Sequence, residues 1–182
     1  MTKDSDAILV AECLEGQTEA FGALVARYEK PIYNIAFRMV RSHEDARDLT
    51  QVVFLKAYEK LESFNPRYKF FSWIYRMAVN ETINFLQKQR QYVPVEDNHL
   101  MHEETPENAY YNRQLAEDID DALTHLQFDY RLVLILRHFQ DLPYSEISQI
   151  LQIPEKTVKS RLFSARRLLG QLLVEESQES RK

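Results

Sequence analysis

The side chains best suited to chemistry in this sequence lie between Lys69 and Arg90, where an aromatic cluster opens a stretch with helical periodicity. On a helical wheel, steps of three and four residues place one indole, one guanidinium and three amides on a single stripe. Indoles stack on nucleic-acid bases, and guanidinium and amide groups hydrogen-bond to base edges. The stripe therefore predicts a nucleic-acid contact, and the alternative is a solvated helix face beside a half-buried tryptophan. Its members are Trp73, Arg76, Asn80, Asn84 and Gln87.

A loop in which aromatic and basic residues alternate precedes this helix. Residues 62–70 lack helical periodicity, and Asn65-Pro66 breaks a helix. In a single-strand site, each base stacked on an aromatic ring contributes about 1–3 kcal/mol. The loop is thus a candidate for single-strand binding, and the alternative is a loop that packs its aromatic rings into the core. The residues concerned are Phe64, Arg67, Tyr68, Lys69 and Phe70.

The segment from Asp45 to Leu61 predicts a helix whose outward face is unusually apolar. Leu49, Val53 and Ala57 share the inward face with Leu61. Apolar residues that line up around an acid and an amide are typical of a partner surface. The alternative is that another helix of the same domain covers them. This outward face consists of Asp48, Gln51, Val52, Leu55 and Tyr58.

A helix-turn-helix is predicted near the C-terminus. A helix of about eight residues begins at Tyr144, a short break covers 152–154, and a second helix begins at Glu155. The second helix has a narrow apolar stripe and an opposite face dominated by basic residues, whereas a solvated face usually mixes the two signs of charge. This pattern predicts binding in a DNA groove. The basic face carries Lys156, Ser160, Phe163 and Arg167, flanked by Thr157, Lys159, Arg161 and Arg166.

The composition predicts the fold class and the distribution of charge along the chain. The 182 residues include three glycines and six prolines, so few turn residues predict an all-α fold and exclude a glycine-rich phosphate loop. The net charge of −5 is unevenly distributed: residues 1–30, 31–90, 91–121 and 122–182 carry −3, +4, −8 and +2. Two mildly basic blocks are therefore separated by an acidic segment.

We accordingly expect two small helical domains, 1–90 and 113–182, joined by a flexible acidic linker at 91–112. The linker is either a solvated spacer or a polyanion that mimics nucleic acid. Its two histidines, His99 and His102, are a weak metal signal, and we expect no metal site. A lone cysteine, Cys13, and the lack of a signal peptide or membrane span favour a cytoplasmic location without membrane insertion.

Local signals also mark the N-terminal helices. A short helix is expected from Asp4 to Glu15, with Gly16 as its C-terminal cap. A second helix begins near Thr18, and Pro31 either kinks it or starts a new one. Ser42, with Asp45 three residues on, predicts the start of the next helix. The apolar residues Ile8, Leu9, Ala11 and Leu14 are expected to share one face of the first helix.

The chain resembles bacterial RNA polymerase sigma factors of the extracytoplasmic-function (ECF) subfamily of the sigma-70 family. Three motifs carry the resemblance, in this order: DARDLTQVVFLKAYEKL, FSWIYRMAVN and YSEISQILQIPEKTVKSRLFSARRLL. The resemblance covers nearly the whole chain. It implies an N-terminal domain that binds the core polymerase and melts the −10 element, and a C-terminal domain that reads the −35 element. The partners implied are core RNA polymerase, promoter DNA and an anti-sigma factor, with a stress or envelope regulon. A catalytic site and a cofactor are not expected.

The resemblance also implies roles for individual residues. Four positions depart from the family pattern: Val52, Asn84, Gln87 and Gln152, the last where glycine is common. The implied polymerase contact is Asp48, Gln51, Phe54 and Leu55; the implied −10 contact is Asn65, Arg67, Tyr68, Phe70, Ser72, Trp73, Arg76 and Asn80; and the implied −35 contact is Lys156, Thr157, Lys159, Ser160, Arg161 and Arg167.

Two other classes of protein share some of these features. A helix-turn-helix transcriptional regulator that does not join the polymerase would also carry the C-terminal motif, but it would not need the polar stripe or the Asp48 face. A nucleic-acid enzyme would need clustered carboxylates or a set of metal ligands. The acidic residues here cluster only in the linker.

Overall fold

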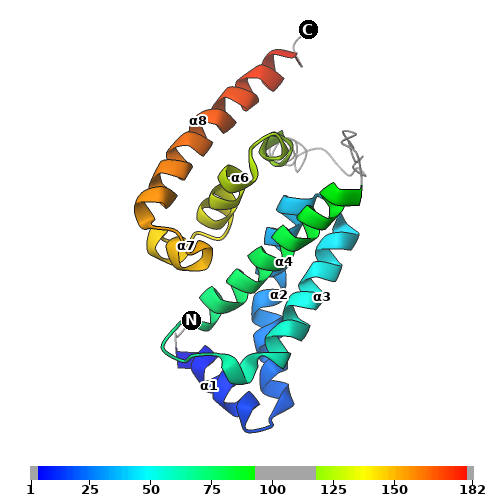
Figure 1. The fold of residues 1–182 in the computed structure, drawn as a ribbon, viewed down its shortest axis with the longest axis vertical. Coiled ribbons are helices and arrows are strands. Elements are labelled where there is room, and N and C mark those ends of the chain that lie inside the picture. The colour runs from blue at the N-terminus through cyan, green and yellow to red at the C-terminus, as the bar shows by residue number, and fades with distance from the viewer. Residues whose placement is uncertain (1–3, 93–117, 180–182) are drawn as a thin grey trace, which may run out of the picture. The chain divides into compact units, whose positions relative to one another are not determined.

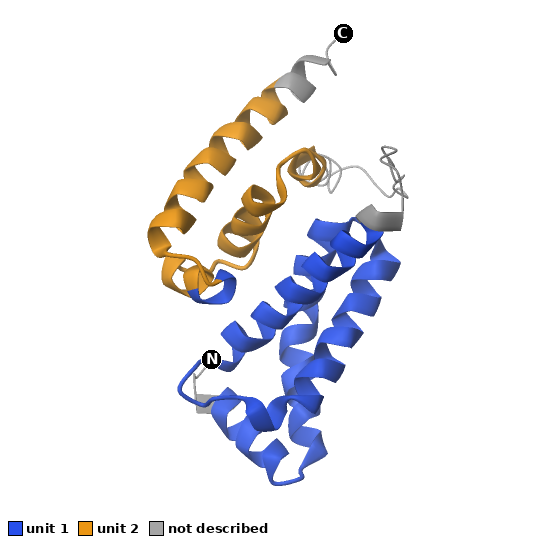
Figure 2. Cartoon of the chain, in the orientation of Figure 1, with its two compact units in different colours: residues 1–95, 149–151 blue, residues 96–148, 152–182 orange. Residues whose placement is uncertain are grey.

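The computed structural model describes residues 4–92 and 118–179, and every regular element within these ranges is a helix (Figure 1). The predicted all-α class is confirmed. The chain divides into two compact units, residues 1–95 with 149–151 and residues 96–148 with 152–182 (Figure 2). The proposed domain limits at 90 and 113 remain predictions, since helix α4 continues to Tyr92 and the acidic stretch lies outside the described residues.

The N-terminal unit is built on three long helices, α2 (Thr18–Val40), α3 (His43–Glu59) and α4 (Phe70–Tyr92), each packed against the other two (Figure 1). Helix α1 (Asp4–Leu14) packs on α2, and the 3₁₀ turn η1 (Leu61–Ser63) follows α3. Apolar side chains at helical spacing drive this packing, because burying each one removes its surface from water. The most deeply buried include Leu24, Ile32, Ile35, Met39, Val53 and Ile74.

Helix α1 ends as predicted but buries a different face. Gly16, at φ +95°, donates to the Cys13 carbonyl at 3.1 Å, and Gln17 donates to that of Glu12 at 3.0 Å, which together form a Schellman cap. Of the four apolar residues grouped on one face, Ile8, Ala11 and Leu14 are exposed and Leu9 is half-buried, whereas Val10, outside that group, is buried. A polar contact explains this orientation, because Asp6 accepts hydrogen bonds from Arg27 and Tyr28 of α2.

The start of α3 confirms the predicted cap, since the Asp45 N–H donates to Ser42 Oγ at 3.2 Å. Pro31 lies inside α2, which continues through it as one helix. Helix α2 ends at Val40, and Arg41, its C-cap residue, adopts the left-handed conformation at φ 60°. Local capping signals therefore fix where these helices begin and end.

The C-terminal unit contains helical residues 118–124, α6 (Phe128–Leu134), a π-helical turn η2 (Ile135–Phe139), α7 (Tyr144–Leu151) except for its last residues 149–151, and α8 (Glu155–Glu179). The break after α7 and the start of α8 confirm the predicted helix-turn-helix. Arg131 donates from Nη2 to the Leu126 carbonyl at 3.3 Å and to that of Thr124, which ties α6 to the preceding helix. The buried core of this unit includes Leu123, Leu132, Val133, Ile135, Leu136, Ile147, Val158 and Leu162.

The turn of the helix-turn-helix is strained at Gln152, which adopts a left-handed conformation at φ 54°. This conformation costs a non-glycine residue about 1 kcal/mol relative to glycine. We therefore expect Gln152→Gly to raise the free energy of unfolding of this unit by up to about 1 kcal/mol. Hydrogen exchange of the α8 amides measures it. Gln149→Gly, within α7, is the matched control and should lower that free energy by about 1 kcal/mol; equal effects of the two changes would contradict the prediction.

Candidate nucleic-acid and protein interfaces

The polar stripe of α4 faces solvent along most of its length. Asn80, Asn84 and Gln87 are exposed, whereas Trp73 and Arg76 are half-buried. Buried residues on the other sides of the helix, among them Ile74 and Ala78, turn the amides outward. Three adjacent amides that hold both donors and acceptors toward solvent can hydrogen-bond to base edges.

The loop before α4 divides its aromatic residues between core and surface. Phe64 and Phe70 are buried and contact each other with ring centroids 5.7 Å apart, which is the packing that the alternative predicted. Tyr68, in contrast, is 64% exposed. Asn65 shapes the turn: its Oδ1 accepts from the Arg67 N–H and its carbonyl accepts from the Tyr68 N–H, both at 3.0 Å. The turn therefore presents one free ring and one exposed cation.

Trp73 links the loop to the stripe. Its indole contacts Phe64 at 5.3 Å and Phe70 at 5.6 Å between ring centroids, so the two buried phenylalanines fix its position. Ser72 is buried, and within the described residues its Oγ has no hydrogen-bond partner. Phe70 and Ser72, which the family resemblance implied as DNA contacts, are thus inaccessible here, and Phe70 instead supports Trp73.

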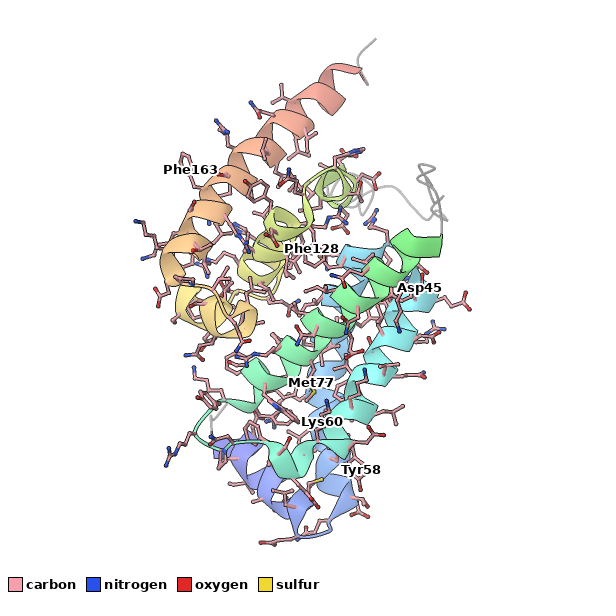
Figure 3. The ribbon with its side chains drawn as sticks, in the orientation of Figure 1. Asp45, Tyr58, Lys60, Met77, Phe128 and Phe163 are labelled. Carbon is pink, nitrogen blue, oxygen red and sulfur yellow. The ribbon has the colours of Figure 1, made fainter. Side chains whose placement is uncertain are left out.

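The outward face of α3 is exposed as predicted, with Leu55 at 64% and Tyr58 at 49%. Tyr58 is labelled in Figure 3. Asp48 and Gln51 are exposed beside them. Phe54 differs: it is 7% exposed and packs edge-on against Phe21 of α2, with centroids 6.4 Å apart. An exposed apolar surface with an acid and an amide at its edge suits a protein partner, and Phe54 supports that surface from below.

The face of α8 opposite its buried stripe is solvent-accessible. Lys156, Ser160 and Arg167 are exposed, and Phe163 is 73% exposed and projects from the helix (Figure 3). Val158, Leu162 and Ala165 are buried on the other side. The helix therefore presents cations, a hydroxyl and an apolar ring together, which are the groups that contact phosphates, base edges and thymine methyl groups in a major groove.

The two flanks of this face differ in charge. On one flank, Arg161 Nη2 pairs with Asp129 Oδ2 of α6 at 2.6 Å, so a carboxylate offsets that cation. Arg161, which the resemblance implied as a DNA contact, thus holds α8 to α6. On the other flank, Lys159 Nζ and Arg137 Cζ lie 5.8 and 5.6 Å from the centroid of the Tyr144 ring.

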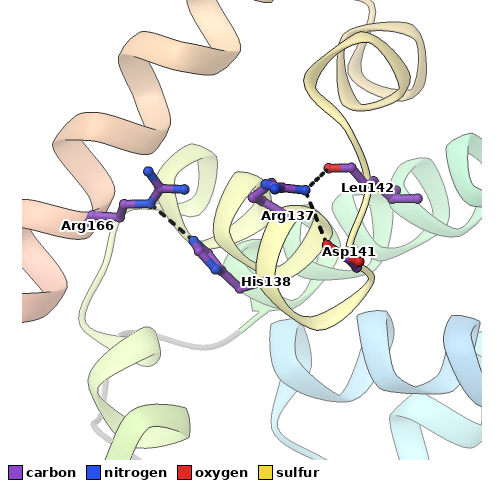
Figure 4. Close-up of polar contacts among 5 residues, drawn as sticks. All are labelled: Arg137, His138, Asp141, Leu142 and Arg166. Atoms are coloured by element: carbon purple, nitrogen blue, oxygen red, sulfur yellow. Dashed lines mark hydrogen bonds and ion pairs between the residues drawn. The ribbon is translucent and has the colours of Figure 1, made fainter.

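The π-helical turn places a histidine beside this second flank. Arg166 Nε donates a hydrogen bond to His138 Nε2 at 3.2 Å (Figure 4). Partial desolvation of the ring, followed by the charges of Arg166 and Arg137, lowers the pKa of His138 from its ordinary value of 6.5. Sequence reasoning missed this pair, because the two residues are 28 positions apart and share no motif.

Two observations concern the described part of the chain alone. It contains no group of three His, Cys, Asp or Glu side chains that could hold a metal ion, and His99 and His102 lie outside it. None of its helices is long and apolar enough to cross a membrane.

Family models match both halves of the chain. The model described as Sigma-70 region 2 matches residues 24–92, and the model described as Sigma-70, region 4 matches residues 116–169. The first match contains the α3 face and the α4 stripe, and the second contains the helix-turn-helix. The groups singled out by their chemistry therefore fall within the two matched regions.

Individual relatives match along nearly the whole chain. The ECF RNA polymerase sigma-E factor of Haemophilus influenzae is 34% identical, with 91% of this chain and 93% of that protein covered. The RNA polymerase sigma-H factor of Pseudomonas aeruginosa is 31% identical, with coverage of 95% and 96%. Among solved structures, CnrH in complex with the cytosolic domain of CnrY has a TM-score of 0.75 at 25% identity, with coverage of 94% and 98%. The sigma factor RpoE in complex with the anti-sigma factor NepR from Bartonella quintana has a TM-score of 0.70 at 23% identity, with coverage of 84% and 96%.

Proposed function

Because the chain belongs to the ECF sigma factors of the sigma-70 family, we propose how its two units divide the work of transcription initiation. As a sigma factor it binds core RNA polymerase and promoter DNA and directs initiation, and it is not an enzyme. The alternative of a regulator that does not join the polymerase is wrong, since relatives matching at least nine-tenths of the chain are sigma factors.

The N-terminal unit holds the core polymerase on the α3 face, defined as Asp48, Gln51, Leu55 and Tyr58. The observation that supports this assignment is the pair of exposed apolar side chains, Leu55 and Tyr58, which lie beside the exposed acid and amide. Apolar area supplies affinity, and polar groups at its edge supply orientation. Val52, 37% exposed, extends the apolar area.

We expect the double variant Asp48→Ala with Gln51→Ala to assemble with core polymerase about tenfold more weakly while keeping its fold. Both side chains are exposed, so their loss leaves the helical core unchanged. Co-elution with purified core polymerase during gel filtration measures assembly. The matched control is Glu29→Ala with Gln17→Ala, an exposed acid and amide of the same unit outside this face. Equal co-elution of the double variant and the control would contradict the assignment.

The same unit captures unpaired bases of the −10 element on a second surface, the melting surface, defined as Asn65, Arg67, Tyr68, Trp73, Arg76 and Asn80. One exposed ring, one half-buried indole and neighbouring amides support this assignment. Phe70 and Ser72 are buried and support this surface from within the unit.

The C-terminal unit reads the −35 element with the recognition face of α8, defined as Lys156, Thr157, Lys159, Ser160 and Arg167. A cationic, solvent-accessible face on the second helix of a helix-turn-helix supports this assignment.

Regulation by an anti-sigma factor also belongs to this proposal, as does action in the cytoplasm on a stress or envelope regulon. The structure of RpoE with the anti-sigma factor NepR suggests the kind of partner. Affinity capture of the tagged chain from its native cell, before and after stress, tests for it. We expect one protein other than polymerase subunits to be captured before stress and released afterwards, and recovery of polymerase alone in both samples would contradict this expectation.

A further inference from the structure

Two basic side chains of the C-terminal unit lie beside the recognition face and are not used in the division of work described above. His138 is on the π-helical turn η2 and Arg166 is on α8, and both are exposed. Arg166 Nε donates to His138 Nε2 at 3.2 Å (Figure 4). An imidazole nitrogen that accepts a hydrogen bond carries no proton, so this contact requires His138 in its neutral form.

Cations surround His138. Arg137 lies on the same turn, where it donates to Asp141 Oδ1 at 3.3 Å and to the Leu142 carbonyl at 3.0 Å. Arg166 faces His138 from α8, and within the described residues it forms no ion pair. From the same flank, Lys159 extends over Tyr144 of α7. A positive charge on His138, added to those of the neighbouring cations, is therefore unfavourable until an anion approaches.

We propose that the His138–Arg166 pair binds a phosphate of the promoter duplex and that His138 takes up a proton from solvent as the DNA binds. The inference rests on the assignment of α8 to duplex recognition. The phosphate oxygens accept from the guanidinium of Arg166 and from the newly protonated Nε2 of His138, in place of the hydrogen bond between the two side chains. The opposite flank is a poorer phosphate site, since Asp129 already pairs with Arg161.

The sign of the pH dependence follows from linkage. In the free chain the pKa of His138 is below 6.5, and a bound phosphate raises it. The DNA complex therefore holds more protons than the free chain between these two pKa values. Affinity for duplex DNA rises as the pH falls through the raised pKa, and it levels off below the pKa of the free chain.

The test uses the full chain and a fluorescent duplex of arbitrary sequence, because phosphate contacts do not depend on sequence. Affinity is measured by anisotropy at constant salt, at about pH 7.5 and about pH 5.5, values that bracket the ordinary histidine pKa. For the wild type we expect about a threefold to tenfold gain at the lower pH. His138→Gln, whose amide oxygen can still accept from Arg166, should lose this gain. The control is His125→Gln, which removes another exposed histidine of the same unit and should keep the gain in affinity at the lower pH.

Arg166 is tested through the salt dependence of binding. Arg166→Ala should reduce the slope of log affinity against log salt by about 0.9, the value for one phosphate, and Arg166→Lys should preserve the slope. A pH gain in His138→Gln as large as in the wild type, or an unchanged slope in Arg166→Ala, would overturn the inference. Lys156→Ala distinguishes failure of the phosphate site from failure of the α8 assignment. If Lys156→Ala is the one variant that loses affinity for DNA, α8 still reads the duplex but the His138–Arg166 pair does not bind a phosphate. If the affinity of Lys156→Ala is also unchanged, the assignment of α8 to duplex recognition is wrong as well.

Discussion

A holoenzyme assembled with the Asn80→Ala variant should bind its promoter as a closed complex normally and fail to open the strands. Asn80 is exposed in the middle of the α4 stripe, where it can hydrogen-bond to an unpaired base but contributes nothing to the buried core. Capture of a base offsets the cost of unstacking it, and the loss of one good hydrogen-bonding contact to that base costs about 1–3 kcal/mol, or roughly a fivefold to hundredfold loss of open complex. Permanganate reactivity of thymines near the start site measures opening, and a mobility shift measures closed binding.

The structure indicates which variants test this surface cleanly. Tyr68→Ala removes a ring that is 64% exposed and should act like Asn80→Ala. Trp73→Ala is less clean, because the indole packs on Phe64 and Phe70 and its removal also destabilises the loop. Gln89→Ala is the matched control: it is an exposed amide on the opposite side of α4 and should open promoters normally. Normal opening by Asn80→Ala and Tyr68→Ala would refute the melting surface.

The second large effect concerns duplex binding. Lys156→Ala with Lys159→Ala should lower the affinity of the holoenzyme for closed promoter DNA by at least about tenfold. It should also reduce the slope of log affinity against log salt, by about 0.9 for each phosphate that a lysine no longer neutralises. Both lysines are exposed on α8. Strand opening, measured per bound complex, should be unchanged, because the melting surface is intact.

Lys30→Ala provides the charge-matched control, since it removes an exposed lysine from α2 of the other unit. The assay is a mobility shift at several salt concentrations. If the double variant bound duplex DNA as well as the control, α8 would not be the duplex reader. If it instead bound normally and opened poorly, the two units would share their tasks rather than divide them.

Local signals predicted the helix limits well. The caps at Gly16 and Ser42 are made by hydrogen bonds between residues three to five positions apart, so a short window of sequence contains the whole interaction. The same holds for the turn between α7 and α8. The left-handed conformation of Gln152 in this turn was not predicted, since most residues other than glycine avoid it.

Burial that depends on distant partners was harder to predict. Phe54 lies at the border between the two faces of α3, and Phe21 of another helix decides that it is buried. Phe70 is buried because its ring meets Tyr28 of α2, with centroids 5.6 Å apart. In both cases a helical wheel shows only one of the two surfaces in contact.

The π-helical turn was also not predicted, because one extra residue in a helical turn hardly alters the apolar periodicity over Leu132, Val133, Ile135 and Leu136. The turn is nevertheless what places His138 near Arg166. The candidate site was thus predictable where a stripe on one helix defines it, as for Asn80 or Lys156. It was not predictable where two elements meet.

Transcription with purified core polymerase on genomic DNA of the source cell tests the central claim most directly. Sequencing of the RNA 5′ ends identifies every start site, and the promoter sequence need not be known beforehand. With the wild-type chain added, we predict a set of start sites that core polymerase alone does not produce, preceded by shared −10 and −35 elements. A pattern of starts identical to that of core polymerase alone would contradict the claim that this chain directs promoter-specific initiation.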